Sequence, residues 1–337
     1  ASPPQQRHPP VPPGNYPNSQ SRPCQCGFEV DLVAARTAAR RGRYSARTRL
    51  WYLSNFRRVR KCGRVSVVEG GAVYLRGRTG DDCKAGFGGV FKCGSIWVCP
   101  VCSAKVARER IGELDRLLTW NTSLGGSAGM VTFTASHYKG QKLKTLLKAM
   151  QNAWSRMTTG RAGQHWRNLQ DLLGVHGYVR ALETVYRDQN GWHPHFHLLL
   201  LFDGPVAQSA VEGFTDLLYG LWEKALASQG MTASRRHGVN LRLSSGTAES
   251  LELLGEYLAK MTFEIAGGRF KSGRKSSAKD GGEPLRTPFE ILADGLETGL
   301  ADDLDLWWEW EDSIPGSRQL LYSSSLKPAA VITHLPA

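Results

Sequence analysis

Several features that would place a chain in a membrane or in a secretory pathway are missing from this sequence of 337 residues. No apolar run reaches the length of about 18 residues that a transmembrane helix needs. The first residues also lack the apolar core of a secretory signal, so we expect a cytoplasmic chain. Instead, residues 1–23 contain 8 of the 16 prolines. This composition predicts a largely disordered or extended tail, which we place at residues 1–35.

Basic residues are abundant overall but absent from one stretch. Residues 290–312 contain nine acidic side chains and neither Lys nor Arg. Since the whole chain has a formal net charge of +13, the remainder has +22. A positive field of that size favours a polyanionic partner, with nucleic acid as the leading candidate. A basic protein that is merely soluble is the plainer alternative.

Cysteine is missing from the whole chain beyond Cys102. All seven cysteines lie within residues 24–102. Without a secretory signal, such clustering favours a metal site in a reducing compartment over disulfide bonds.

The densest part of the cysteine cluster is the segment CGSIWVCPVC, which ends at Cys102. It supplies Cys93, Cys99 and Cys102 at the short, turn-forming spacing that thiolates need to surround a tetrahedral zinc ion. The fourth ligand must come from elsewhere, and either Cys62 or Cys83 can provide it. Buried thiols in a small β domain are the alternative interpretation.

Residues 36–125 as a whole are expected to form a zinc-ribbon-like, DNA-binding module. A helical periodicity follows the cysteines over residues 103–118. Residues 36–64, ahead of the cysteines, are rich in Arg and Lys with aromatic residues among them, a composition that suits phosphate contacts and base stacking. A solvated basic helix explains that composition equally well. The candidate DNA-binding residues are Arg57, Arg58, Arg60 and Lys61.

The following segment, residues 126–268, reads as an α+β domain. We expect strands over residues 129–136, 176–187, 191–202 and 239–243, and helices over 139–157, 164–173, 206–228 and 246–265. This order favours an antiparallel sheet with helices on one face, in an RRM-like or ferredoxin-like arrangement. Residues 269–337 are treated as a C-terminal extension.

Three histidines alternate in the stretch GWHPHFHLLLLF. Because strand side chains alternate, His193, His195 and His197 share one face. His195 and His197 are then about 7 Å apart at Cα, close enough for both imidazoles to bind one metal ion. A third ligand depends on the preceding turn. An odd loop around Gln189 places Glu183 opposite His195 on the same face, whereas an even loop turns Glu183 away.

A nucleophile is available on the expected helix 246–265. Tyr257 and Lys260 lie three residues apart, on one face of that helix. A tyrosine hydroxyl can attack a phosphodiester when a metal ion and a nearby ammonium group neutralise the developing charge. Considered alone, Tyr257 could equally be a tyrosine that packs between a helix and a sheet.

The motifs VTFTASHY, HPHFHLLL and EYLAKM, in that order, resemble motifs 1, 2 and 3 of HUH-superfamily endonucleases. More narrowly, they resemble the rolling-circle replication initiators of Gram-positive, notably actinobacterial, plasmids. The cysteine segment and the downstream sequences RTPFEIL and WWEWEDSIPGSRQLLYSSSL share this resemblance, which covers most of residues 58–326. It implies an HUH nuclease core built on a five-stranded antiparallel sheet.

The resemblance also implies roles for individual residues. His195 and His197, with Glu183, would hold Mg²⁺ or Mn²⁺, while His193 would support the site and zinc would be structural. Tyr257 would attack single-stranded origin DNA and form a 5′-phosphotyrosine, with Lys260 neutralising the phosphate. A host polymerase and helicase are the implied partners, with a dimer as one oligomeric state.

The sequence departs from some relatives at one position. They place a Glu four residues before the tyrosine for the terminating step, where this chain has Leu253. Glu256 and Glu252 are the nearest acidic residues, so the termination chemistry is open.

Three other functions agree less well with the sequence than that of a replication initiator. An HUH transposase of an insertion element would place a second tyrosine four residues after the first, at the position of Met261. A catalytically inactive zinc-ribbon DNA-binding regulator would be expected to have lost one of the motif residues, but all are present. A metallohydrolase of small molecules would explain neither the charge nor the cysteines.

Overall fold

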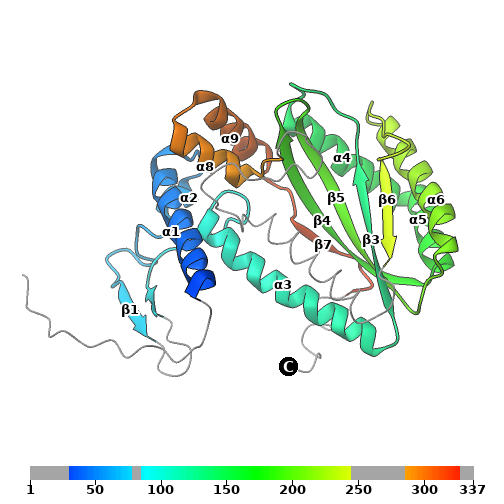
Figure 1. Ribbon diagram of the computed structural model, residues 1–337, viewed down its shortest axis with the longest axis horizontal. Helices are drawn as coiled ribbons and strands as arrows, with labels where there is room; N and C mark the ends of the chain where they lie inside the picture. The colour runs from blue at the N-terminus through cyan, green and yellow to red at the C-terminus, as the bar shows by residue number, and fades with distance from the viewer. Residues whose placement is uncertain (1–29, 78–84, 244–284, 327–337) are drawn as a thin grey trace, which may run out of the picture.

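The computed structural model describes residues 30–77, 85–243 and 285–326 (Figure 1). Helix α1 begins at Val30 and ends at Leu53. Its first turns therefore fall within residues 1–35, which the proline content had assigned to a disordered tail. That prediction was wrong for residues 30–35, where no proline interrupts a helical sequence. No helix in the described part of the chain has the length and apolar character needed to span a bilayer.

The centre of the molecule is a five-stranded antiparallel sheet, which confirms the expected α+β class. Its strands lie in the order β6-β3-β5-β4-β7. They are β3 (Ser127–Thr134), β4 (Val175–Arg187), β5 (Gly191–Phe202), β6 (Val239–Leu243) and β7 (Leu320–Tyr322). The RRM-like arrangement is not confirmed. Strand β5 is central, so its apolar run is buried on both faces.

The hairpin of β4 and β5 closes through a loop of three residues. Arg187 pairs with Gly191, so residues 188–190 form the loop. Gly191 adopts a φ of 78°, in the left-handed region that glycine enters without steric cost. The loop is therefore odd, and the register places Glu183 directly opposite His195.

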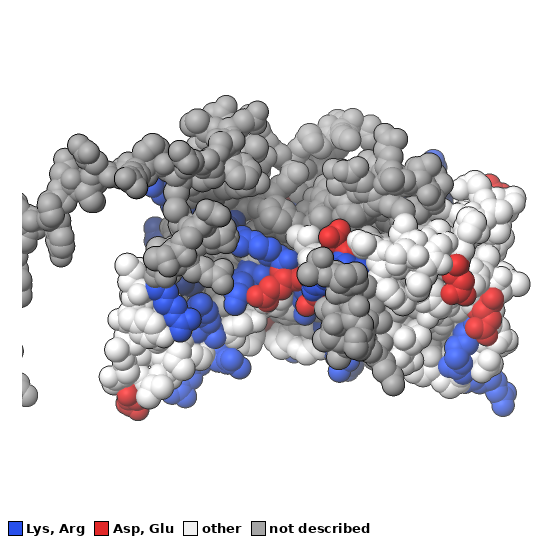
Figure 2. All heavy atoms as spheres, turned by 90° about the horizontal axis from the view of Figure 1, so that it is seen from below, with Lys and Arg blue, Asp and Glu red and all other residues white. Residues whose placement is uncertain are grey.

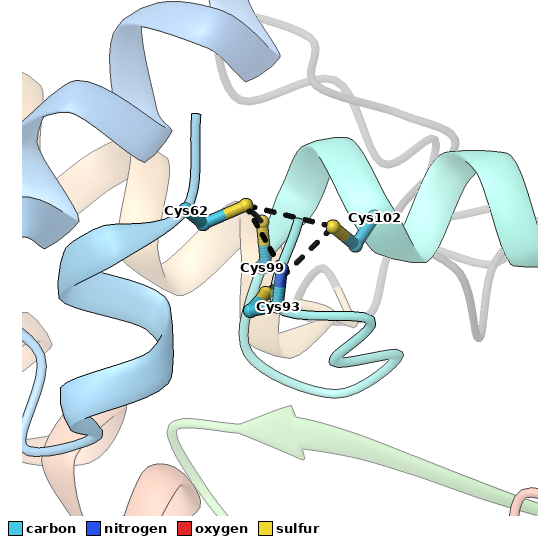
Figure 3. A group of neighbouring side chains, drawn as sticks. All are labelled: Cys62, Cys93, Cys99 and Cys102. Atoms are coloured by element: carbon cyan, nitrogen blue, oxygen red, sulfur yellow. Dashed lines mark hydrogen bonds between the residues drawn. The ribbon is translucent and has the colours of Figure 1, made fainter. Parts of the chain in front are cut away.

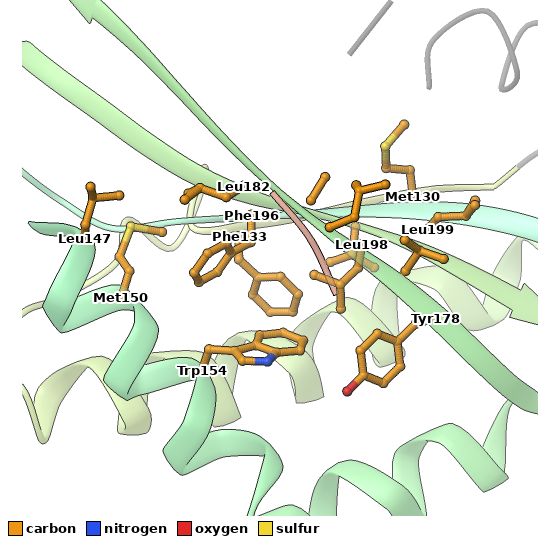
Figure 4. Close-up of a cluster of buried hydrophobic side chains, with 14 of the residues drawn as sticks. Met130, Phe133, Leu147, Met150, Trp154, Tyr178, Leu182, Phe196, Leu198 and Leu199 are labelled. Carbon is orange, nitrogen blue, oxygen red and sulfur yellow. The ribbon is translucent and has the colours of Figure 1, made fainter. Parts of the chain in front are cut away.

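One face of the sheet packs on helices α4 (Leu143–Thr158), α5 (Gly160–Leu172) and α6 (Ser209–Ala227). Trp154 of α4 lies at the centre of this core (Figure 4). Its indole makes edge contacts with Phe133, Phe196 and Tyr178, at centroid distances of 5.8–6.0 Å. Since Phe196 lies between His195 and His197, these contacts anchor the core face of β5 and leave the histidines on the other face.

The segment before the sheet lies beside it, and helix α3 runs from this segment to the sheet (Figure 1). It consists of α1, the short helix α2 (Arg57–Lys61), the hairpin of β1 (Tyr74–Gly77) and β2 (Ala85–Gly88), and the long helix α3 (Pro100–Ser123). Helix α3 begins with Pro at its first position, where a missing N–H costs nothing. The four cysteines described below hold these pieces together.

The C-terminal segment is part of the fold rather than an appendage. Helix α8 (Pro288–Thr298) begins with a capping box of Thr287 and Glu290, and helix α9 (Ala301–Ser313) follows it. Strand β7 then pairs with β4 and forms an edge of the sheet. Separating residues 269–337 from the catalytic domain therefore overlooked one of the five strands.

Candidate functional site

Glu183, His195 and His197 form a compact cluster on the sheet face opposite Trp154. Their ligand atoms all lie within 4.8 Å of one another. Glu183 Oε2 is 2.6 Å from His195 Nε2 and 2.7 Å from His197 Nε2. The three side chains are 12, 11 and 4% exposed, so the site is largely shielded from bulk water.

The second nitrogen of His195 indicates what the cluster can bind. His195 Nδ1–H donates to the carbonyl of His193 at 3.3 Å. A neutral imidazole has only one N–H, so the lone pair of His195 Nε2 then faces the Glu183 carboxylate. Two lone pairs this close repel unless a proton or a cation lies between them. A divalent ion therefore fits this donor set, which has two imidazoles and one carboxylate.

The pKa shifts within the cluster also favour binding of a cation. Burial alone would raise the pKa of Glu183, but the charge and hydrogen bonds of His195 and His197 lower it below its ordinary value. Burial lowers the pKa of His197, and burial together with the charge of His195 lowers that of His193 to about 3. An ionised Glu183 beside a neutral His197 is the protonation state that metal binding requires.

Two contacts around the cluster involve residues that the sequence analysis missed. Thr132 Oγ1, on the neighbouring strand β3, lies 3.0 Å from His197 Nδ1. His137, in the loop after β3, places Nε2 at 2.9 Å from His193 Nδ1. Both residues belong to the stretch VTFTASHY, so strand pairing of that motif with β5 is the signal that could have found them. His193 thus contacts a histidine outside the cluster, and its supporting role stays a prediction.

Replacing Thr132 with valine should weaken metal binding at this cluster by about 10- to 100-fold, the usual effect of losing a hydrogen bond to a ligand. Valine has the same shape but cannot fix the ring of His197. Titration with Mn²⁺, followed by the electron paramagnetic resonance of the free ion, measures the change. Thr134→Val is the matched control, because its hydroxyl donates to the His237 carbonyl and to no ligand. Equal affinities in the two variants would refute an orienting role for Thr132.

The four cysteines Cys62, Cys93, Cys99 and Cys102 come together at a second cluster (Figure 3). Cys62 follows α2, Cys93 lies in the loop after β2, and Cys99 and Cys102 flank the start of α3. All four are buried, and none is oxidised. The structure thus brings Cys62 to the other three, whereas Cys83 lies outside the described residues.

The spacing of the four sulfurs fits tetrahedral zinc. The Cys62–Cys102, Cys93–Cys102 and Cys62–Cys99 sulfur pairs are 3.6–3.7 Å apart. A zinc tetrahedron with bonds of about 2.3 Å has edges of about 3.8 Å. Hydrogen bonds from the other three thiols lower the pKa of Cys62, and the amides of Cys93 and Ser95 donate to cluster sulfurs. Hydrogen bonds with Cys102 and Cys62 raise the pKa of Cys93 and Cys99 in turn, so the four thiols do not all ionise without a cation among them. The cluster is built from helix ends and a loop, and the zinc-ribbon description is not confirmed.

The candidate DNA-binding residues lie on α2 beside this cluster. Arg57, Arg60 and Lys61 line a cavity of about 470 Å³, whose remaining lining is Trp51, Arg64 and Val65. Arg58 points elsewhere and lies over the Phe91 ring at 6.0 Å. Lys and Arg side chains gather over the part of the molecule that contains these elements (Figure 2).

The acidic, tryptophan-rich stretch connects the cysteine module to the sheet. Trp310 of α9 donates from Nε1 to the carbonyl of Trp97, between the cluster cysteines, and stacks on Trp192 at the start of β5. Glu309 accepts from the indole of Trp192 and from the Leu143 amide that begins α4. Glu311 is fully buried and accepts from Ser54 and from the Asn55 amide. Helix α9 therefore fixes the position of the module relative to the histidines.

The remaining predicted site residues, Tyr257, Lys260 and Glu256, lie outside the described residues, as does the expected helix 246–265. Their roles stay predictions.

Comparison with known proteins finds a family of replication proteins and two relatives from Streptomyces. The model of a family described as Replication protein matches residues 91–228. A protein named Protein rep from Streptomyces lividans is 27% identical over 71% of this chain and 63% of its own length. The Neomycin resistance protein of Streptomyces cyanogenus is 27% identical over 68% of this chain and 66% of its own length. The chain thus spans somewhat less than two thirds of these relatives.

A solved structure matches as well. The N-terminal nuclease domain of non-structural protein 1 from minute virus of mice is 12% identical over 55% of this chain and 81% of that chain. Its TM-score of 0.19 is too low to support a conclusion about the fold. The family match and the two Streptomyces relatives confirm the resemblance to replication proteins.

Proposed function

We propose that this chain, whose residues 91–228 match the replication-protein family, initiates rolling-circle replication of a plasmid by nicking and rejoining one strand at the origin. The observation that carries the proposal is the cluster of Glu183, His195 and His197, held on adjacent strands with their ligand atoms within 4.8 Å. A buried cluster of this composition is difficult to explain by packing alone, because each member must give up solvation.

Each predicted site residue would have its own role in strand cleavage. Glu183, His195 and His197 would hold Mg²⁺ or Mn²⁺ beside the scissile phosphate. When bound, such an ion polarises the phosphate and offsets the charge that develops during displacement. Tyr257 would attack phosphorus through its phenolic oxygen, forming a 5′-phosphotyrosine as the bond from phosphorus to the 3′-oxygen breaks. Lys260 would balance the charge on the phosphate, and the proton that the Tyr257 phenol loses would be matched by one that the departing 3′-oxygen takes up.

Energy conservation explains why a tyrosine ester suits a replication initiator. The phosphotyrosine keeps the energy of the broken phosphodiester, so the reverse attack by a 3′-hydroxyl can rejoin the strand without a nucleotide cofactor. The free 3′-hydroxyl would meanwhile prime synthesis by a host polymerase, with a host helicase separating the strands. The cysteine module would bind the flanking origin DNA through Arg57, Arg58, Arg60 and Lys61, with zinc at Cys62, Cys93, Cys99 and Cys102 supporting the fold.

The test is a nicking assay on supercoiled DNA that carries the origin of the same plasmid. With added Mn²⁺ or Mg²⁺, we expect a nick in one strand only and protein attached covalently to the new 5′ end. Chelation of the divalent ion should stop the reaction, and adding Mn²⁺ back should restore it. Relaxation of DNA without covalent protein, or cleavage of both strands, would refute the proposal.

A further inference from the structure

The cavity beside α2 brings together the two kinds of side chain, cationic and aromatic, that the composition of residues 36–64 predicts for DNA binding. Its lining contains four cationic side chains, Arg57, Arg60, Lys61 and Arg64, together with the indole of Trp51 and no carboxylate. Four cations this close together repel one another unless an anion lies among them. A site with that lining is suited to an anionic ligand that also has a flat, stackable face.

The indole of Trp51 is held rigidly in place. Its Nε1–H donates to the carbonyl of Cys62 at 2.8 Å. This bond fixes the edge of the indole to the cysteine cluster, while the ring is only partly buried. The guanidinium carbons of Arg47 and Arg64 lie 5.7 Å from the ring centroid. The edge of Trp51 is thus fixed, and a base that stacks on its ring would take the place of a guanidinium group that lies over it.

The shape of the cavity selects among forms of nucleic acid. A volume of about 470 Å³ is in the range of small-ligand pockets, roughly 300–1,000 Å³. Bases stacked in a duplex are read by elements that protrude into a groove, whereas this cavity is an open hollow on the surface. An unstacked nucleotide of a single strand can place its base in such a pocket and its phosphate among the cations.

We propose that this pocket binds one unstacked nucleotide of the single-stranded origin DNA, with the base stacked on Trp51 and the adjacent phosphate held by Arg60, Lys61 and Arg64. This inference rests on the proposed function and adds a second point of attachment for the strand, away from the histidine cluster. Because α2 ends at Cys62 and Trp51 is bonded to that residue, the cysteine cluster would position the pocket directly.

The experiment measures binding separately from cleavage. The full chain with Tyr257→Phe is titrated, without added divalent ion, onto a fluorescent strand from the nick region. In a series of such strands a single abasic site, which removes one base and keeps its phosphate, is moved along the sequence. We expect one position at which the abasic site lowers affinity by roughly 5- to 100-fold, the range for losing one base–aromatic stack.

The variant Trp51→Ala then completes a thermodynamic cycle. It should lower affinity for the intact strand by a similar factor and should show no further loss at the sensitive abasic position. Trp51→Phe should retain most of the binding. Tyr52→Ala is the matched control, because Tyr52 is a neighbouring aromatic residue that is 74% exposed and does not line the pocket. It should keep the full abasic penalty.

A flat abasic scan, or an undiminished penalty in Trp51→Ala, would overturn the pocket assignment. Equal sensitivity of duplex and single strand to Trp51→Ala would overturn it too, since it would indicate contact with duplex phosphates. Binding to an unrelated single strand of equal length is measured as well, so that failure of the pocket proposal can be told from failure of the nicking proposal. Stacking tolerates most sequences, so the pocket should bind this strand too. If the wild-type protein nicks the origin while affinity does not depend on the position of the abasic site, only the pocket proposal is refuted. If Trp51→Ala weakens binding of both strands but nothing is nicked, only the nicking function fails.

Discussion

A protein with Tyr257 replaced by phenylalanine is expected to form no covalent adduct with origin DNA and to nick it at least about 1,000-fold more slowly than wild type. The substitution removes one oxygen atom and keeps the aromatic ring, so packing of the surrounding chain should change little. Metal affinity should be unaltered, because Glu183, His195 and His197 are intact. Denaturing electrophoresis of a 5′-labelled origin strand measures both the adduct and the nick.

Tyr138 provides a demanding control for this result. It lies in the loop after β3 next to His137, which contacts His193, and its side chain is 69% exposed. It is therefore the described tyrosine best placed to compete for the role of nucleophile. Tyr138→Phe should nick and join at nearly the wild-type rate. If Tyr138→Phe lost the adduct while Tyr257→Phe kept it, the nucleophile would be Tyr138 and the assignment drawn from motif 3 would be wrong.

The histidine cluster shows how far sequence patterns can define a site. Alternation along a strand was sufficient to place His195 and His197 on one face, because the side-chain period of a strand does not vary. The position of Glu183 was not determined in the same way, since it depends on whether the hairpin loop is odd or even. That parity follows from the backbone of Gly191, and a glycine next to Asn190 is compatible with turns of either length.

Contacts between distant segments were harder to predict than strands and helices. The amphipathic pattern of residues 139–157 predicted α4, which begins at Leu143 and ends at Thr158. By contrast, Glu309 accepts a hydrogen bond from the amide of Leu143, and the two lie 166 residues apart in the chain. A local pattern contains no information about such pairings. For the same reason the acidic stretch had no assigned role until α9 was found between the cysteine cluster and β5.

The choice between Cys62 and Cys83 as the fourth zinc ligand could not be made from spacing. Both precede Cys93 by distances that a chain can span. In the structure, the turn after α2 brings Cys62 Sγ to 3.6 Å from Cys102 Sγ and 3.7 Å from Cys99 Sγ. Loop closure, rather than a sequence motif, therefore determines the ligand set.

The largest expected loss of stability follows from Cys99→Ser. Cys99 is fully buried and supplies one of four sulfurs, so serine would leave an incomplete site with a hydroxyl at its centre. Because structural zinc contributes its binding free energy to folding, we expect zinc to fall from one per chain to almost none. The free energy of unfolding of the module should then fall by several kcal/mol. For comparison, the apparent free energy of zinc binding in small domains is about 10–16 kcal/mol. Metal analysis and thermal unfolding measure the two effects.

Cys83→Ser is the matched control for the zinc site. It removes the alternative ligand and should leave both zinc content and thermal stability at wild-type values. The Cys99→Ser protein should also lose the nucleotide pocket, because Trp51 is bonded to Cys62, yet its Mn²⁺ affinity at Glu183, His195 and His197 should fall much less. The sheet that carries those three residues has its own core around Trp154. Full zinc in Cys99→Ser, or loss of zinc in Cys83→Ser, would contradict the four-cysteine assignment.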